Sequence, residues 1–219
     1  MKKLFLFLPL ILLINGCFFG TFQTARPIAA GSVDSGWFVN FPLYTNKNVR
    51  ESQKSSGTAF TIPNFGGHIS YGASNFAEFG LYGSLGEGIG PFGKFLLLSE
   101  YSYPVSFGVL AGFAYHPFAQ GISWKLDLIL SHSLSPYASL YGGFHYGYQP
   151  DYRTSLPADT DIWQISNFAD FQEIFVGIEL ARKTQVRKSL KRMPYSLTME
   201  FGIPLVSQPA IFVGFQFKI

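Results

Sequence analysis

The 219-residue sequence has one cysteine, few charged residues and only one long hydrophobic run. Charged side chains make up 13% of the chain, against about 25% in typical globular domains, which leaves little charge for a soluble surface. The hydrophobic run, Leu4–Ile14, is shorter than the roughly 20 residues of a membrane-spanning helix. If the mature chain crosses a membrane, it must therefore do so as a closed β-barrel, because lipid leaves no partner for unpaired backbone groups.

The net charge gives no reason to expect a nucleic-acid partner. The formal charge is +3, and it falls to +1 when Lys2 and Lys3 are removed with a signal peptide. Such a weak balance lacks the basic excess that attracts phosphate backbones. Aromatic residues are abundant instead, with 24 Phe and 12 Tyr, and 23 glycines accompany them.

The first twenty residues have the pattern of an export signal. Lys2 and Lys3 precede the apolar run, as in the first two regions of a signal peptide. The lone Cys17 would have no disulfide partner in an exported protein. The sequence Ile14-Asn15-Gly16-Cys17 resembles the lipobox of bacterial lipoproteins. That resemblance implies that Cys17 is acylated and becomes the new N-terminus, whereas a plain signal peptide with an incidental cysteine is the alternative.

The resemblance also implies a destination and a division of the chain. Phe18 stands where an aspartate would retain a lipoprotein in the inner membrane, which favours the outer membrane. We expect a signal peptide at residues 1–16, a lipidated N-terminal tether at 17–31 and a β-barrel at 32–219.

Alternation of apolar and small or polar residues predicts antiparallel β-strands along the rest of the chain. In "AIFVGFQFKI", which closes the sequence, every second residue from Ile211 to Ile219 is apolar. The expected strands lie near 32–43, 60–71, 76–85, 91–99, 105–113, 122–130, 137–148, 174–180, 195–203 and 211–219. The prediction is an all-β, antiparallel, up-and-down transmembrane barrel of about ten strands, with eight or twelve as alternatives.

The two faces of the predicted strands differ in a way that indicates which one meets lipid. The apolar face carries Phe, Tyr, Trp, Leu and Ile, as a lipid-facing band does. The other face is rich in glycine, serine and threonine, with scattered charges that suit a crowded interior. We expect a lumenal polar cluster there, formed by Lys125, Asp127, Glu173 and Glu200. Inward Phe175 and Phe212 would help to fill the barrel.

The lengths of the connections suggest an orientation in the membrane. Segments 44–59 and 149–170 are long and polar, as outer loops are, whereas the turns near 72–75 and 132–136 are short and periplasmic. Segment 181–194 carries six basic residues and falls on the periplasmic side. It is either a site for anionic phospholipid headgroups or a solvated turn.

Two local patterns resemble those of bacterial outer-membrane barrel lipoproteins. "QTARPIAAG" at 23–31 is similar to the segment that leads into their first strand, and "HISYGASNFAEFGL" at 68–81 is similar to one of their hairpins. The C-terminal strand, 210–219, resembles the C-terminal signal of outer-membrane barrels, which implies contact with the barrel-assembly machinery. The resemblance implies an architecture and outer-membrane lipids as partners, but it implies no activity.

One group of residues suggests catalysis. His68-x-Ser70, with Glu78 on the next strand, resembles the arrangement of outer-membrane lipid A deacylases, in which a histidine activates a serine nucleophile. A buried hydrogen-bond cluster is the alternative interpretation. His132-Ser133 lies in an expected turn with no acid nearby.

The remaining motifs indicate little chemistry. "GIGPFG" at 88–93 matches a dinucleotide-binding pattern, but it is expected between strands and precedes no helix, so the required context is missing. Neither a metal nor a cofactor is expected, since His116 and His145 lie on different strands. Trp37, Trp124 and Trp163 are expected as anchors at the membrane interface.

We therefore expect a lipid-anchored, non-enzymatic outer-membrane barrel with a structural or interaction role through its outer loops. A narrow passive channel for small solutes, a lipid A deacylase-like enzyme and a periplasmic lipid-tethered barrel that binds an apolar ligand are the alternatives.

Overall fold

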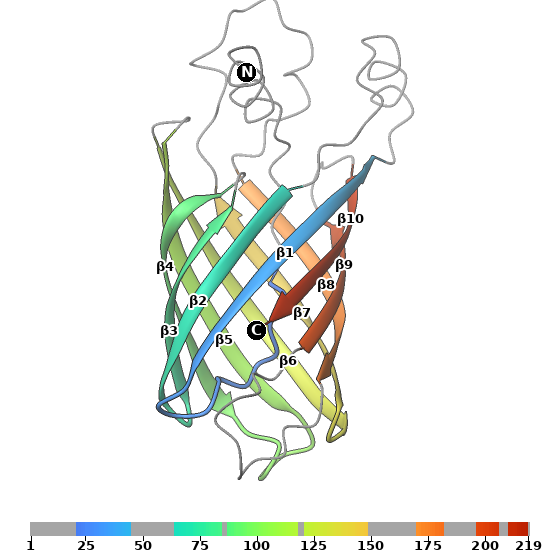
Figure 1. Cartoon of the computed structure of the whole chain (residues 1–219). Coiled ribbons are helices and arrows are strands. Elements are labelled where there is room, and N and C mark those ends of the chain that lie inside the picture. Colours follow the sequence, from blue (N-terminus) through green and yellow to red (C-terminus); the bar gives the residue numbers. More distant parts are fainter. Residues whose placement is uncertain are drawn as a thin grey trace, which may run out of the picture.

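The structure, a computed structural model, describes residues 21–44, 64–84, 87–117, 121–148, 170–181, 196–205 and 210–218. Within these ranges the chain forms ten antiparallel strands that close into a barrel (Figure 1). None of the described residues belongs to a helix long and apolar enough to cross a membrane. The strands are β1 (Val33–Tyr44), β2 (Asn64–Ser74), β3 (Ala77–Ser84), β4 (Gly88–Leu98), β5 (Ser106–His116), β6 (Gly121–Ser135), β7 (Ala138–Tyr148), β8 (Asp170–Ala181), β9 (Ser196–Pro204) and β10 (Ala210–Lys218).

The barrel closes because its first strand pairs with both its neighbour and its last strand. Gly36 on β1 lies opposite His68 on β2 and opposite Lys218 on β10. Each strand from β2 to β9 pairs with the strands before and after it in the sequence. The prediction of an all-β, up-and-down antiparallel barrel with about ten strands is confirmed.

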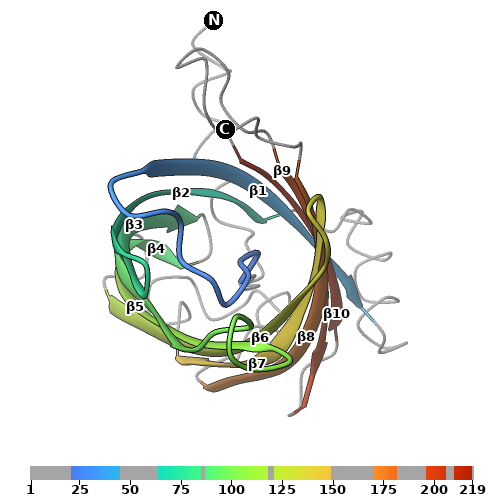
Figure 2. The same cartoon turned by 90° about the horizontal axis from the view of Figure 1, so that it is seen from below.

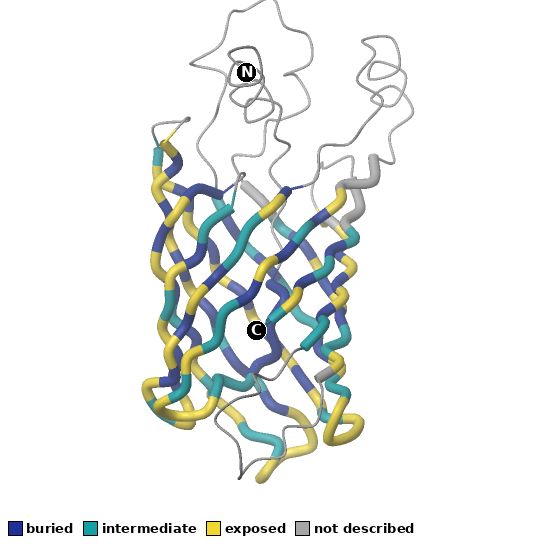
Figure 3. The backbone as a smooth tube through the Cα atoms, in the orientation of Figure 1, coloured by how far each residue is buried: buried dark blue, intermediate teal, exposed yellow. Residues whose placement is uncertain are grey.

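Burial alternates along each strand, as the period of two requires (Figure 3). The inward side chains include the aromatic residues Tyr82, Phe92, Tyr141 and Phe175, each at most 6% exposed. Large apolar side chains point outward on the described strands. They include Trp37, Phe65, Ile69, Leu81, Ile89, Phe113, Ile122, Trp124, Leu128, Val176, Met199 and Phe217.

Several strand ends differ from the predicted ones. The prediction that 88–93 lies between strands is wrong, because this segment is the first half of β4. Its glycines reflect crowding: a Cβ at Gly90 would collide with the backbone of Phe113. The turn expected at 132–136 is also misplaced. β6 continues to Ser135 because a register shift after Ser133 lets it keep pairing with β7.

The hairpin expected to turn at 72–75 also runs further. β2 begins at Asn64 and extends to Ser74, with an irregularity in its pairing after Gly72. Other expectations fall outside the described residues. They concern Cys17, Trp163, the side chain of Phe212, Ile219, nearly all of the loops 44–59 and 149–170, and the basic residues of 181–194.

Candidate functional site

The chain before β1 runs inside the barrel. Residues 21–26, which we call the luminal segment, are encircled by the strands in the view along the barrel axis (Figure 2). Phe22 is 1% exposed and Ala25 is fully buried, although neither belongs to a strand. Part of the expected tether at 17–31 therefore lies inside the barrel.

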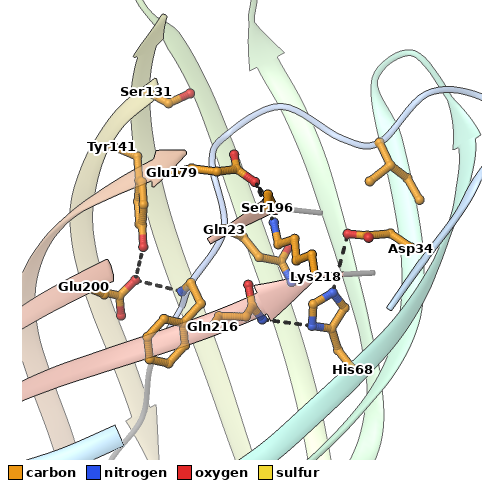
Figure 4. A network of polar contacts seen from close by, with 12 residues as sticks. Gln23, Asp34, His68, Ser131, Tyr141, Glu179, Ser196, Glu200, Gln216 and Lys218 are labelled. Atoms are coloured by element: carbon orange, nitrogen blue, oxygen red, sulfur yellow. Dashed lines mark hydrogen bonds and ion pairs between the residues drawn. The ribbon is translucent and has the colours of Figure 1, made fainter. Parts of the chain in front are cut away.

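The N-terminal end of this segment is bound by acidic side chains from two strands. The Glu200 carboxylate on β9 accepts hydrogen bonds from the backbone N–H groups of Thr21 at 2.9 Å and Phe22 at 2.7 Å. The Thr21 hydroxyl donates to Asp127 on β6 at 2.9 Å. The Tyr141 hydroxyl donates to Glu200 at 2.9 Å (Figure 4). Two successive N–H groups that converge on one carboxylate form an anion-binding arrangement, here used within the chain.

Phe22 is held by packing as well as by its N–H group. Its ring stacks on Phe38 of β1 with ring centroids 5.2 Å apart. It also lies against Gly214 of β10, where a Cβ would collide with the ring. The backbone of Phe22 has a φ of 47°, in the left-handed region that non-glycine residues seldom adopt. Such a conformation costs about 1–3 kcal/mol and persists only when surrounding contacts hold it, and Glu200 and Phe38 supply those contacts.

The middle of the luminal segment is bound by a buried ion pair. The Lys94 ammonium on β4 donates to the Gln23 side-chain carbonyl at 2.9 Å and lies 2.8 Å from the Glu78 carboxylate on β3. Glu78 in turn accepts a hydrogen bond from the backbone N–H of Ile28 at 3.0 Å. This chain of contacts links the segment to two adjacent strands and leaves both charges paired, as buried charges require.

The C-terminal end of the segment is fastened near the turns that follow β4 and β6. The Ala25 N–H donates to the Ser131 hydroxyl at 3.2 Å. The Arg26 guanidinium lies 3.0 Å from Glu100 and also contacts the Ser133 hydroxyl. Desolvation acts to raise the pKa of Glu100, but hydrogen bonds from Ser133 and the charge of Arg26 outweigh it and hold that pKa below its usual value.

The four residues expected in a lumenal cluster are all buried, but they do not pair with one another. Lys125 lies 3.3 Å from Glu87 and its ammonium lies 4.0 Å from the centre of the Tyr82 ring. Asp127 contacts both Thr21 and His145.

The other two carboxylates of that expected cluster lie on neighbouring strands. Glu200 binds the luminal segment, as described above. Glu173, 2% exposed, lies over Gly202, whose missing side chain leaves room for it, and its Oε2 has no hydrogen-bond partner among the described residues.

A second polar group surrounds the expected catalytic histidine. His68 Nδ1 lies 3.1 Å from the Gln216 amide nitrogen, and His68 Nε2 lies 3.7 Å from Asp34 (Figure 4). Nearby, Lys218 contacts Glu179 at 3.1 Å. This histidine therefore contacts Gln216 of β10 and lies close to Asp34 of β1.

The expected catalytic residues are not assembled as a nucleophile and its base. Ser70 and His68 both point inward from β2, but no hydrogen bond joins them in the described part of the chain. A serine nucleophile needs an adjacent base to be activated. Glu78 is engaged by Lys94 and Ile28 instead. All three side chains are nine-tenths or more buried, so none is presented to lipid.

The other candidates remain separate or take structural roles. No group of three potential metal-ligating side chains occurs among the described residues. Trp37 and Trp124 point outward, with 70% and 38% of their surfaces exposed. Contrary to expectation, Ser133 has an acid nearby, because its backbone N–H donates to Glu100 at 3.1 Å.

Sequence reasoning missed the residues that hold the luminal segment. Thr21, Phe22 and Gln23 precede the first strand and follow no period. Their partners Glu200 and Asp127 are more than 100 residues away in sequence. The sequence did show inward charges on distant strands. These charges indicated a polar interior, but not that the luminal segment fills it.

Comparisons with known proteins assign this chain to no family. No protein-family model matches the sequence, and no curated protein matches it either. An outer membrane channel from Pseudomonas putida F1 is 8% identical, with a TM-score of 0.43 over 92% of this chain and 98% of that one. A FadL homologue from Pseudomonas aeruginosa is 10% identical, with a TM-score of 0.34 over 85% of this chain and 61% of that one. At these values no activity passes from either protein to this chain.

Proposed function

We propose that this chain is a non-enzymatic outer-membrane β-barrel that is closed in its resting state. The observation that carries the proposal is the distribution of charge across the wall. Among the strand residues whose side chains the structure describes, no Asp, Glu, Lys or Arg points outward, and large apolar groups dominate the outer face. A barrel in water requires a charged outer face, whereas a barrel in a membrane requires an apolar, lipid-facing band.

The interior supports a closed state. The luminal segment occupies the barrel together with Tyr82, Tyr141 and Phe175. Buried ion pairs such as Lys94–Glu78 bind the segment to the wall. Small barrels are usually filled by their side chains, and here the chain itself adds to the filling. A periplasmic barrel for an apolar ligand has less support, because the inward face is charged.

The connections favour the orientation predicted from the sequence. The two longest connections, residues 45–63 and 149–169, join strands at one end, whereas residues 75–76, 136–137 and the longer 182–195 join them at the other. Long outer loops and short periplasmic turns are typical of outer-membrane barrels. We assign the interaction role to these two long loops, whose residues lie outside the described ranges.

The proposal includes acylation of Cys17, with one adjustment. Cys17 precedes Thr21 by four residues, which span at most about 14 Å when extended. Since Thr21 is bound to Glu200 and Asp127 inside the barrel, an acylated N-terminus would hold the luminal segment close to a barrel mouth. It would not act as a long tether.

Membrane extraction of the wild-type chain and of two variants tests the proposal. The full chain is expressed in a Gram-negative host, and outer membranes are washed with urea and with carbonate. We expect the protein to stay in the membrane fraction and to shift on gels when heated, as folded barrels do. Release of Cys17→Ser, but not of a Leu128→Arg variant, would contradict the proposal, because a lipid-tethered soluble barrel depends on its anchor alone.

A further inference from the structure

We propose that the luminal segment is a displaceable plug, and that its release opens a cation-selective path for small polar solutes through the barrel. This inference rests on the proposed function, since a path matters only if the barrel spans a membrane. The inference goes beyond the proposed function because it names the part of the chain that moves and the class of solute that passes.

The segment can leave without breaking the barrel. Among the described residues, backbone–backbone hydrogen bonds between the N-terminal chain and the strands begin only at Gly31, which donates to Gly72 at 2.8 Å. The hydrogen bonds that the backbone N–H groups of residues 21–28 donate to the wall are accepted by wall side chains. The ladder that closes the barrel runs between β1 and β10 and includes none of these residues.

The conformation of Phe22 favours release once its contacts are loosened. Its left-handed backbone is held by the Glu200 carboxylate and by packing on Phe38. When these contacts are lost, the residue gains freedom to adopt an ordinary conformation. The opposing cost is exposure of Glu200 and Asp127, and water entering the lumen would solvate both.

The charged side chains that line the lumen around the segment are predominantly acidic. After release, the lumen would be lined by seven carboxylates and three ammonium groups among the described residues, a formal excess of four negative charges. They are Asp34, Glu78, Glu87, Asp127, Glu173, Glu179 and Glu200, with Lys94, Lys125 and Lys218. Rings of carboxylates favour cations in pores, and a channel with this lining would exclude large apolar solutes.

Glycine positions show how closely the wall fits the segment. A Cβ on Gly108 of β5 would lie 2.7 Å from the Ala25 backbone oxygen, closer than such atoms pack. Gly112 on the same strand also faces inward, but a Cβ there would meet Tyr82 at 3.0 Å and Phe92 at 3.2 Å. Gly108→Ala therefore presses on the luminal segment, and Gly112→Ala serves as the matched control.

The decisive experiment releases the luminal segment from the barrel wall by one substitution and holds it in place again, in the same protein, with a disulfide. Phe22→Pro removes the N–H that donates to Glu200 and forbids a positive φ. Ala30→Pro, at an exposed position outside the luminal segment, is the control. Both are made in the full chain, and bilayer conductance is recorded after each protein is shown to be folded by its heat-dependent gel mobility.

The lock is a disulfide between Ala25→Cys and Ser131→Cys, two positions joined by a hydrogen bond of 3.2 Å. It is introduced into the Phe22→Pro chain with Cys17→Ser to prevent mispairing. We expect frequent opening of Phe22→Pro, closure on oxidation and renewed opening on reduction. In a KCl gradient the open channel should favour potassium, and Gly108→Ala should open more often than Gly112→Ala.

The outcomes separate this inference from the proposed function. If folded Phe22→Pro inserts into bilayers but conducts no more than Ala30→Pro, the luminal segment is not a displaceable plug. The proposal of a membrane-spanning barrel would be unaffected. The plug inference would also be overturned if the oxidised disulfide variant still conducts, or if the open channel favours chloride. Failure of every variant to float with liposomes would instead contradict the proposed function.

Discussion

Thr21 and Glu200 are 179 residues apart in sequence, yet the backbone nitrogen of Thr21 lies 2.9 Å from a carboxylate oxygen of Glu200. This contact ties the start of the described chain to the ninth strand, in the interior of the barrel. It makes Glu200 an acceptor for the luminal segment as well as part of the wall.

Glu200→Gln should loosen the N-terminal end of the luminal segment. The amide can still accept one hydrogen bond, but the charge that strengthens both N–H contacts is lost, at a cost of roughly 1–2 kcal/mol. We expect amide exchange at Thr21 and Phe22 to accelerate about tenfold, in line with that cost. Glu173→Gln is the control, because Glu173 has no hydrogen bond to the segment in the described structure. Equal effects of the two variants would contradict this role for Glu200.

Leu128→Arg should destabilise the barrel if its outer face contacts lipid. Leu128 lies midway along β6 and points outward, and an arginine near the bilayer centre costs about 2–4 kcal/mol in such barrels. Urea unfolding in vesicles measures the change. Tyr101→Arg is the control, because Tyr101 lies in the turn after β4 and is 91% exposed. Equal stability of the two variants would count against a lipid-facing β6.

The contact between Arg26 and Glu100 should weaken in acid. The pKa of Glu100 is lowered in the folded chain, so its contribution is fully present above its ordinary pKa and is lost as the pH falls through the lowered value. Amide exchange near Ala25 and Arg26 should then approach that of Glu100→Gln measured at the same pH. A constant difference between wild type and variant across this range would refute the prediction.

Ser70→Ala should leave lipid A acylation unchanged. Ser70 and His68 are buried and share no hydrogen bond in the described structure, and His68 contacts Gln216 instead. Mass spectrometry of lipid A from hosts that express wild type, the variant or neither provides the measurement. A deacylated species that appears only with the wild-type chain would restore the enzymatic interpretation.

Much of the wall could be predicted from local alternation. The inward positions of Asp127 and Glu200 and the outward positions of Leu128 and Phe217 follow from a period of two within each strand. Strand ends were less predictable. Glycines next to close backbone contacts, as at Gly90, resemble a loop in the sequence but permit a crowded strand.

The polar interior was predictable only in part, because pairing depends on register between strands. Alternation placed Lys125 and Asp127 on one face, but their partners Glu87 and His145 come from other segments. The luminal segment carries no periodic signal, and its position depends on contacts with distant strands. A single sequence therefore gave no indication that Phe22 lies inside the barrel.

Spin labels scanned along β6 test the central claim most directly. Single cysteines from Ile122 to Leu130, in a Cys17→Ser chain reconstituted into liposomes, report contact with oxygen in lipid or with a water-soluble nickel complex. We expect a period of two, with strong oxygen contact at Trp124, Leu126, Leu128 and Leu130 and weak contact at the positions between them. Contact with the nickel complex at those four outward positions, and no oxygen signal, would show a water-facing wall and contradict the membrane barrel.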